Sequence, residues 1–554
     1  NADGWNGVAG LESGRGADRE AEAAYRRAIE ADPYDALPRA NYAILLLEQN
    51  RMAEAKAEID RAAALDPNAS FVQLARGRYE LQMGEVKRAL DSVLAASAAN
   101  PASGNDLVLL AATYYENGDY AAAVQQLDNA DRLDAYDPTS SLLRTIFALD
   151  HYEADQAILA AREAARRYRT RADYFSPIAT TREGGSYVSS AFRFLTLNSW
   201  GRFYSDEAFD PFVASGYFDE AIIGQPRALQ LQNPLDGPDI GEFAGPTSFS
   251  SLMQGLMIDP LAIASRNRWT DPIRRPFFDT TISAGTVWRD DAFGPTVDID
   301  VNAFSNAGIP VSVFANVEGM SSPSDETNNR FDAASATLIV GANPTAYDRV
   351  VAFGLYSHDQ PALPRTESFT TPNDQRRTTS AVGGAAWSHS FGYRHAVSTA
   401  VWVDHAADKA DTQRGILVGG VLPGLLDVDN KGNATSVNGA VAHAIGVGPV
   451  TIRSGVEVSG AERSAERTDT LYTFVRPPQS VRQTSDGSLD AGRVYVDALV
   501  RPVRNFQVEA AAFGSFMSGD SELARFDPRI GVGYMPLEGQ WLRAGWRSDP
   551  EFPT

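Results

Sequence analysis

Residues 21–33, AEAAYRRAIEADP, have two close counterparts at a spacing of 34 residues: AKAEIDRAAALDP at 55–67 and ALDSVLAASAANP at 89–101. Each copy opens with alanine, has a large residue four positions on, a second alanine three positions after that, and a closing proline. This spacing puts the alanines and the large residue on one face of a helix. Proline ends a helix. The segment therefore predicts a helix whose small residues allow close packing against a neighbour.

A fourth, less regular copy follows the first three. Its proline, Pro138, stands 37 residues after Pro101 instead of 34. Each interval leaves room for a second amphipathic helix, so one unit is a helix pair, and a fixed period of this length is typical of a solenoid. The repeated positions are Ala21, Ala55 and Ala89; Tyr25, Ile59 and Val93; Ala28, Ala62 and Ala96; Pro33, Pro67 and Pro101; and, in the fourth copy, Ala111, Ala123, Leu127 and Ala130.

The period and pattern resemble the tetratricopeptide repeat over residues 2–138, with Trp5 and Gly77 at the large and small positions of the first helix. The resemblance implies an all-α solenoid over 1–138 that offers a concave surface to a protein partner. A rigid spacer is the alternative interpretation. Residues 139–172 are predicted to form a closing helical pair. Because Trp5 already stands in register, we expect further repeats upstream.

Residues 173–279 are predicted to be an irregular connector or a plug-like segment. The helical period fades here while aromatic residues and prolines increase, and 225–246 holds four prolines and three glycines, which indicates a loop. The stretch RNRWTDPIRRPFF at 266–278 mixes charged and aromatic residues. It suits a plug or a gasket between two domains, and an ordered linker equally well.

Residues 280–554 change to a period of two. Val456 and Val458, for example, alternate with Glu457 and Ser459. One apolar and one polar face suit a lipid-facing wall around a wet lumen, although a soluble β-sandwich also alternates. Short turns alternate with long polar segments such as 406–433 and 461–489, which are predicted to be loops. This arrangement of connections is typical of an outer-membrane barrel.

The pattern predicts about 13 strands in an antiparallel transmembrane β-barrel. Bacterial single-chain barrels close with an even number of strands, so the odd count predicts a barrel that is incomplete in this chain, with strands beyond Thr554. The predicted strands are 280–289, 294–304, 309–319, 330–341, 348–358, 378–390, 394–405, 434–445, 449–460, 490–501, 505–517, 526–535 and 540–547.

Charged residues on the polar face of these strands are the candidate lumen lining. Charges along a channel are a better interpretation than carboxylates paired for acid–base catalysis. An acidic lumen would suit a neutral or cationic sugar polymer, and a lumen rich in arginine would count against that cargo. The candidates are Asp298, Asp300, Arg453, Glu457, Arg493, Asp497 and Glu509.

Composition excludes several other functions. The 49 basic and 71 acidic side chains give a net charge of −22, which argues against nucleic acid as a partner. The chain has no cysteine for a thiolate metal site. DVDNKGN at 427–433 is similar to the start of a calcium loop, but Lys431 stands at a ligand position, and an Asx-rich turn explains the stretch. We expect no metal, no cofactor and no enzymatic activity.

Repeats followed by such a barrel resemble, in architecture, the exopolysaccharide export porins and the surface-lipoprotein assembly modulators. The resemblance implies a Gram-negative outer-membrane protein with periplasmic repeats that exports or translocates a polysaccharide or a surface protein. Its partners would be outer-membrane lipid, an envelope protein bound by the repeats, and a polysaccharide. The alternatives are a non-conducting envelope scaffold anchored by the barrel, and a soluble repeat protein with a β-sandwich.

Overall fold

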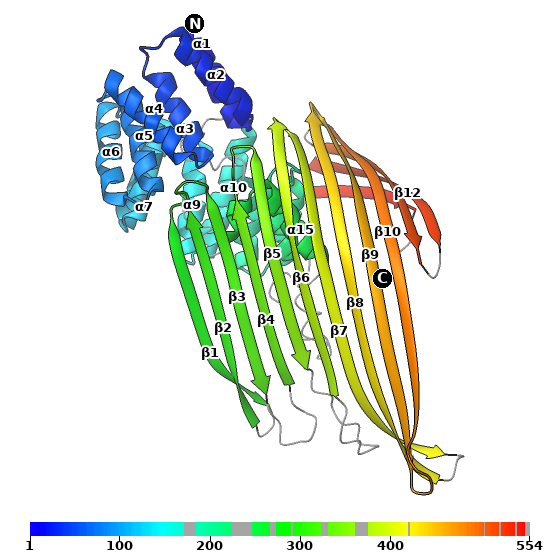
Figure 1. The fold of residues 1–554 in the computed structure, drawn as a ribbon. Helices are drawn as coiled ribbons and strands as arrows, with labels where there is room; N and C mark the ends of the chain where they lie inside the picture. The colour runs from blue at the N-terminus through cyan, green and yellow to red at the C-terminus, as the bar shows by residue number, and fades with distance from the viewer. Residues whose placement is uncertain are drawn as a thin grey trace.

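The computed structural model describes residues 1–170, 184–223, 246–265, 273–289, 292–322, 331–360, 375–418, 422–503, 505–519, 522–537 and 540–548. A helical solenoid lies at one end of a curved 13-stranded sheet, and a helical connector packs against one face of that sheet (Figure 1). The layout is the predicted one: helical repeats followed by antiparallel strands.

The solenoid consists of five consecutive helix pairs, and its repeats are the predicted tetratricopeptide repeats. The residues expected to hold a closing pair, 139–172, contain most of α9 and α10. The helices are α1 (Ala2–Arg15), α2 (Asp18–Ala31), α3 (Leu37–Glu48), α4 (Met52–Leu65), α5 (Ser70–Gln82), α6 (Val86–Ala99), α7 (Gly104–Glu116), α8 (Tyr120–Leu133), α9 (Pro138–Asp150) and α10 (Ala154–Thr170).

Small residues allow the helices of each pair to cross closely. Ala21, Ala55 and Ala89 are completely buried. A Cβ atom at Gly77 would lie 2.4 Å from Cγ2 of Val93, so α5 approaches α6 too closely for any side chain at that position. The repeated alanines are therefore packing residues, as the sequence predicted.

Pro138 has a different role from the earlier prolines. The helix α8 ends at Leu133, which is 34 residues after the end of α6 at Ala99, so the fourth repeat keeps the period. Pro138 is instead the first residue of α9, where the missing N–H costs nothing and the fixed φ favours the helix. The apparent shift of the proline is thus the start of the next helix.

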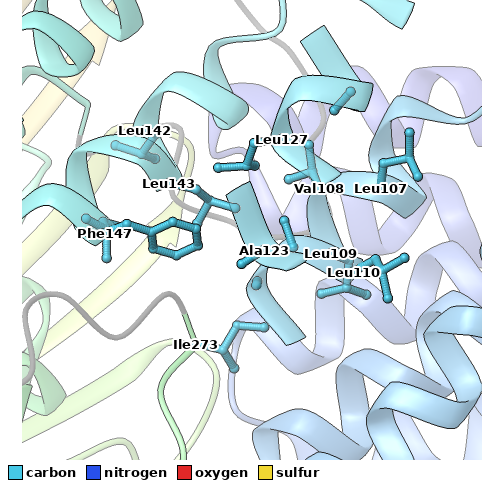
Figure 2. Close-up of a cluster of buried hydrophobic side chains, with 14 of the residues drawn as sticks. Leu107, Val108, Leu109, Leu110, Ala123, Leu127, Leu142, Leu143, Phe147 and Ile273 are labelled. Atoms are coloured by element: carbon cyan, nitrogen blue, oxygen red, sulfur yellow. The ribbon is translucent and has the colours of Figure 1, made fainter. Parts of the chain in front are cut away.

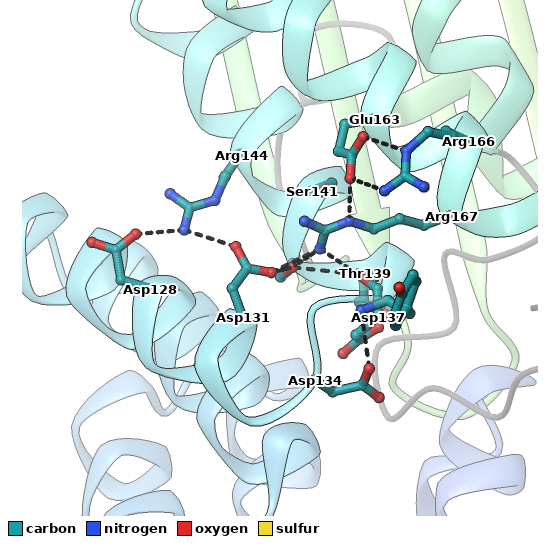
Figure 3. A network of polar contacts seen from close by, with 12 residues as sticks. Asp128, Asp131, Asp134, Asp137, Thr139, Ser141, Arg144, Glu163, Arg166 and Arg167 are labelled. Atoms are coloured by element: carbon teal, nitrogen blue, oxygen red, sulfur yellow. Dashed lines mark hydrogen bonds and ion pairs between the residues drawn. The ribbon is translucent and has the colours of Figure 1, made fainter. Parts of the chain in front are cut away.

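A polar network joins the fifth pair to the fourth (Figure 3). The guanidinium of Arg167 on α10 lies 2.7 Å from an Asp131 carboxylate oxygen and 2.8 Å from one of Glu163. It also donates to the carbonyl oxygen of Asp137 and to the hydroxyl of Ser140. Hydrogen bonds from Arg166 and from Arg167 lower the pKa of Glu163 to about 2. A buried arginine with several acceptors holds the last turn of the solenoid together.

The connector enters the solenoid core. Ile273 is only 2% exposed and packs with Leu143 and Phe147 of α9 and with residues of α7 and α8 (Figure 2). Nearby, Arg275 lies 2.8 Å from the Glu116 carboxylate. These contacts fix the solenoid to the segment that leads directly into the first strand.

The described part of 173–279 is largely helical, which corrects the prediction of irregular structure. Its helices span 6 to 13 residues and do not continue the 34-residue repeat, and its aromatic residues pack between helices, as Phe192 and Tyr204 do with ring centres 5.2 Å apart. The elements are α11 (Gly184–Phe194), α12 (Asn198–Ala208), α13 (Ala214–Ile223), α15 (Pro246–Ile258) and η3 (Pro260–Ser265).

Most of the predicted 225–246 loop and of the 266–278 segment lies outside the described residues. In the parts of the chain that are described, no helix combines the length and apolarity needed to cross a membrane.

The sheet has 13 strands in sequence order, each antiparallel to the next, as predicted. The order starts at β1 and ends at β13, and these two edges are not paired with each other among the described residues. The strands are β1 (Phe277–Arg289), β2 (Ala292–Ser305), β3 (Val311–Ser322), β4 (Phe331–Ala342), β5 (Asp348–Gln360), β6 (Gln375–Gly392), β7 (His395–Val418), β8 (Leu422–Val447), β9 (Val450–Thr473), β10 (Gln479–Val503), β11 (Phe506–Ser518), β12 (Leu523–Leu537) and β13 (Gln540–Arg547).

Two predicted long loops, 406–433 and 461–489, are mostly strand. They are the outer halves of β7 to β10, which run 24 to 26 residues. Both faces of these halves carry polar side chains, so the alternation that identified the other strands is absent there. The four strands form an extension beyond their neighbours, visible at the lower right of Figure 1; we call it the β7–β10 extension.

Apolar side chains fix the connector helices to one face of the sheet, here called the inner face. Leu256 of α15 and Ile263 of η3 pack with Phe314, Ile339 and Phe353 of β3, β4 and β5. The register places these three strand residues on the same face. The space over β3–β6 is thereby filled.

Candidate functional site: the cavity on the inner face

A cavity of about 1440 Å³ lies on the inner face beside the packed helices. The connector contributes residues 210–213, Tyr217, 253–254 and 257–258. Strands β5 to β11 provide the wall, and residues of α1 and α2 border the solenoid end. Residues far apart in the sequence therefore build this space together.

The wall of the cavity is formed largely by small side chains. Ala396 and Ala400 of β7 and Ala440 and Ala444 of β8 line it, where the corresponding face of β3–β5 carries phenylalanine and isoleucine. Lining residues on β7 extend to Asp404, so the cavity runs for about eight residues, or roughly 26 Å, along the strand. Side-chain size on one face decides where the sheet is filled and where it is open.

Five of the candidate lumen residues gather on β9, β10 and β11. The guanidinium of Arg453 lies 3.0 Å from the Asp497 carboxylate and 3.2 Å from that of Glu509. Arg493 lies 3.9 Å from Glu457. Arg453, Glu457 and Arg493 line the cavity, while Asp497 and Glu509 hold Arg453 from the side. Each arginine therefore has an acidic neighbour.

The other two candidates lie apart from the cavity. Asp298 and Asp300 on β2 both accept hydrogen bonds from the Nδ2 of Asn316 on β3, at 2.7 and 3.0 Å. Neither lines the cavity. The register puts all seven candidates on the inner face but in two separate groups.

The cavity lining is close to electrically balanced. Its five carboxylates are those of Asp18, Asp210, Asp359, Asp404 and Glu457, and its six guanidinium groups are those of Arg15, Arg19, Arg349, Arg394, Arg453 and Arg493. The acidic lumen expected from the sequence is not found here, since Arg15 and Arg19 come from the solenoid and Arg394 from a turn, and the sequence does not reveal their position. This balance counts against a cationic cargo.

Contacts with two turns of the sheet hold the first repeat at the cavity entrance. The guanidinium of Arg19 lies 4.1 Å from the ring centre of Tyr347, and that of Arg15 lies 4.7 Å from the ring centre of Tyr393. The backbone N–H of Tyr393 donates to Glu20 at 3.4 Å. These contacts could not be predicted from the sequence, because no pattern links exposed residues of a helix to a turn more than 320 residues away.

Glu22 on α2 connects the solenoid to the sheet. Its carboxylate accepts hydrogen bonds from Tyr42 at 2.8 Å, from Arg51 at 2.8 Å and from the Tyr347 hydroxyl at 3.3 Å. Burial alone would raise the pKa of Glu22, but the hydrogen bonds from Arg51 and Tyr42, with the charges of Arg51 and Arg26, lower it below the usual value. The carboxylate thus stays charged at neutral pH and joins two repeats to one turn.

The opposite, outer face of the sheet exposes large apolar side chains. Val441, Val456 and Val494 lie side by side on β8, β9 and β10 and are 51%, 47% and 49% exposed. The next outward row holds Val458. Towards the turns, the next row holds Val496 beside His443 and Ser454, and the row after it holds Ile445 and Ile452. These rows form an apolar band on β8, β9 and β10 that one row interrupts with His443 and Ser454, and exposed apolar surface of this kind marks contact with a membrane or a partner.

Aromatic residues border the band on both sides. Phe278 and Trp288, at either end of β1, are 74% and 73% exposed, and Phe506 and Phe516 occupy the same relative positions on the outer face of β11. Each pair is separated by ten residues, about 33 Å along the strand and roughly 25 Å in height at a tilt near 40°. This height is that of the apolar band of outer-membrane barrels.

The outer face becomes polar beyond the band. The row after Val403 and Val437 contains His405, Thr435 and Glu462. Further rows of the β7–β10 extension hold charged side chains on the same face, namely Lys409, Lys431 and Glu466, and Asp411, Asp429 and Arg482. On β7, β8 and β9 the change follows the row of Val403 and Val437, and on β10 it begins within that row, at Asp490.

No metal site is present among the described residues, where no three histidine, cysteine or carboxylate side chains gather. Residues 427–433, predicted to be an Asx-rich turn, lie within β8, and Lys431 is 2.9 Å from Asp429. The prediction of a turn was wrong because the polar stretch pairs with β7 and β9 along its whole length.

Comparison with known proteins supports the repeats. Residues 15–78 match the family model described as tetratricopeptide repeat. No curated protein sequence matches the chain.

Solved structures with a similar fold include a tetratricopeptide repeat protein from Parabacteroides merdae, 13% identical over 46% of this chain and 98% of that one, with a TM-score of 0.30. PilF of Pseudomonas aeruginosa is 18% identical over 37% and 89%, with a TM-score of 0.27. The APC/C hetero-tetramer Cut9–Hcn1 is 15% identical over 47% of each chain, with a TM-score of 0.35, so the match spans about half of that chain's length.

Proposed function

We propose that the sheet is the wall of an outer-membrane barrel, with the repeats in the periplasm of a Gram-negative bacterium. The observation that carries this proposal is the outer face. Its apolar band spans about 25 Å between aromatic borders and gives way to polar and charged rows on β7 to β10. Exposure of this band to water would be energetically unfavourable, whereas lipid tails would cover it.

The solenoid lies on the side of the short turns, as a periplasmic module would. Tetratricopeptide repeats offer a concave surface for a protein, so an envelope protein is the proposed partner. The contacts of Arg15, Arg19 and Glu22 with the turns keep that partner next to the cavity. The first repeat thus connects a recruiting surface with a route along the wall.

The cavity is the proposed route for an exported polymer, such as an exopolysaccharide, or for a segment of a surface protein. It extends along the inner face for roughly 26 Å, about the height of the apolar band. Its nearly balanced charge suits a neutral chain better than a strongly charged one. The function requires no catalytic step.

A non-conducting scaffold is the second candidate. The observation in its favour is the apolar packing of α15 and η3 against β3–β6, which fills part of the inner space. In that case the barrel anchors the repeats and the cavity carries nothing.

Membrane fractionation of the full chain, with gel mobility before and after boiling, tests the location. We expect the protein in the outer membrane and a mobility shift on heating, and a protein that stays in the soluble fraction without a shift overturns the membrane proposal. Single-channel conductance then separates the two candidates. If the cavity is a transport route, we expect a measurable current. If the barrel is filled and only anchors the repeats, we expect none.

A wall in hydrocarbon requires that β1 and β13 also have strand partners, because unpaired backbone groups are not tolerated there. Hydrogen exchange in bilayers measures this directly. We expect the amides of β1 to exchange as slowly as those of β4. Fast exchange along β1 alone would contradict a continuous barrel wall.

A further inference from the structure

The β7–β10 extension has an unpaired edge on β10. Within the described residues, β10 pairs with β11 only from Asp490 onward, whereas it pairs with β9 from Gln479. Residues 479–489 therefore present eleven residues of strand without a strand partner on that side, with Gly519 lying against Ser488 and Leu489 at the inner end. All of them are exposed except Gly487, which is partly covered.

This edge lacks most of the features that usually prevent strand addition. Residues 479–489, QSVRQTSDGSL, contain no proline and no lysine, their two charged residues are of opposite sign, and the register with β9 continues without a bulge. Proline, lysine, bulges and very short strands are the common protections of an edge. Only another extended backbone provides donors and acceptors at the required alternate positions.

The side chains along the edge are complementary to their own copy. Arg482 and Asp486 stand two residues on either side of Thr484, and both lie on the outer face. In an antiparallel pair centred on Thr484, each Arg482 lies opposite Asp486 of the other copy. Ser480 lies opposite Ser488, and no like charges meet. Opposite charges at directly facing positions stabilise an antiparallel pair.

We infer that the free edge of β10 pairs antiparallel with the same edge of a second copy of this chain, about a two-fold axis at Thr484. Arg482 already contacts Glu466 of its own chain at 2.7 Å, and a guanidinium has donors left for a second carboxylate.

The pairing dictates how the two copies face each other. Because the paired strands run in opposite directions, the two solenoids lie at opposite ends of the dimer. The inference does not rest on the proposed membrane location. If both hold, the two copies sit in facing membranes, since the extension lies on the side of the apolar band away from the solenoid.

Cysteine cross-linking tests the inference, because the natural chain has no cysteine. In the full chain purified in detergent, Thr484→Cys puts two thiols at the axis, where facing Cα atoms of an antiparallel pair are about 4.5–5.5 Å apart and suit a disulfide. We expect most of the protein to form a covalent dimer under mild oxidation. The control Thr470→Cys, on β9, lies one strand away from the edge and should give almost none.

The register gives a second readout. Arg482→Cys and Asp486→Cys should each form little dimer alone, because identical residues lie about 13 Å apart, and abundant heterodimer when mixed. Equal dimer at residues 470 and 484, or no dimer at either, overturns the inference. So does a Thr484→Cys variant that cross-links only to Leu417→Cys of β7, which would indicate pairing of two different edges.

Charge reversal distinguishes specific dimerisation from nonspecific disulfide formation. Asp486→Arg places like charges across the axis twice and should weaken self-association about fivefold in analytical ultracentrifugation. Arg482→Asp combined with Asp486→Arg restores opposite charges and should restore the dimer. A double variant no better than the single one contradicts self-pairing. Membrane fractionation reports on the proposed function separately, whatever the oligomeric state.

Discussion

The solenoid and the sheet place their large apolar side chains in opposite locations. In the solenoid, Phe147, Leu109 and Leu127 are buried between helices. In the sheet, Val441, Val456 and Val494 are about half exposed on the outside, while the charges of Arg453 and Asp497 face inward. Large apolar side chains therefore lie inside the solenoid in the first third of the chain, but on the outside of the sheet in the last half.

Under the proposed membrane location, the two regions of the chain face different solvents. Apolar burial stabilises a helix bundle in water because it removes apolar surface from water. An apolar band that faces outward gains the same benefit only where the surroundings are apolar. Substitutions of equal chemistry in the two regions should therefore have unequal effects, and these effects test the comparison.

The largest effect is expected in the solenoid core. Phe147→Ala removes a ring that is 1% exposed and stacks on Tyr115 at 4.0 Å between ring centres, and should lower the free energy of unfolding by about 3–5 kcal/mol. Urea unfolding of the full chain, followed by circular dichroism at 222 nm, measures it. The exposed Leu94→Ala is the control, with a change below about 0.5 kcal/mol. Equal losses would mean that the helices do not bury their core.

The second effect concerns the outer face. Val456→Arg puts a charge in the middle of the apolar band and should cost about 2–4 kcal/mol in a bilayer, and Thr470→Arg, on the same face of β9 but in the extension, about 0–1 kcal/mol. Equilibrium unfolding of the protein folded into phospholipid vesicles measures both. If the two variants are equally stable in lipid, the band is not in contact with hydrocarbon.

Much of this contrast could be predicted from the sequence because each region has its own period. Alanines at 21, 28, 55 and 62 define helix crossings, and alternation along β9 defines two faces. The extension was missed because both of its faces are polar, so 461–473 has no alternation even though it pairs with β10. The connector helices were missed because short segments such as α13 are held by tertiary contacts and not by a visible pattern.

The cavity itself could not be predicted. Its lining joins Arg15 of α1, Tyr217 of α13, Met257 of α15 and Arg453 of β9, residues that only the three-dimensional arrangement brings together. The sequence placed Arg453, Glu457 and Arg493 on the correct face, since alternation settles the face. It could not show which part of that face α15 covers, nor that solenoid arginines balance the strand carboxylates.

Paired charges allow a sharper test of the comparison. Arg167 in the solenoid is 10% exposed in its side chain and Arg453 on the inner face is 31% exposed. Arg167→Met removes the donor to the buried carbonyl of Asp137 and the buried hydroxyl of Ser140, and one charge partner of Asp131, and should cost about 2–3 kcal/mol. Arg453→Met should cost a similar amount, about 2–3 kcal/mol, because the Asp497 side chain is 8% exposed, does not line the cavity, and loses the guanidinium that lies 3.0 Å away. Unfolding in urea compares them, and a loss below about 1 kcal/mol for Arg453→Met would mean that water reaches Asp497.

The smallest effect is a pH dependence confined to the solenoid. Arg166 and Arg167 lower the pKa of Glu163 from 4.5 to about 2. Between pH 4.5 and pH 2, the unfolded chain therefore binds a proton at this carboxylate more readily than the folded chain does. Stability from this carboxylate is therefore complete above about pH 5 and lost as the pH falls towards 2. Because its side chain is 35% exposed, solvent screening reduces the contribution to about 1 kcal/mol.

Glu163→Gln should thus unfold more easily than the natural chain at pH 7, and the difference in the 222 nm urea midpoint should shrink steadily between pH 5 and pH 3. Asp60→Asn, which removes an exposed pair with Lys56, serves as the control and should show no such convergence. A Glu163→Gln difference that stays constant with pH would mean that the carboxylate is not held by the two arginines, and that the last repeat is closed by apolar packing alone.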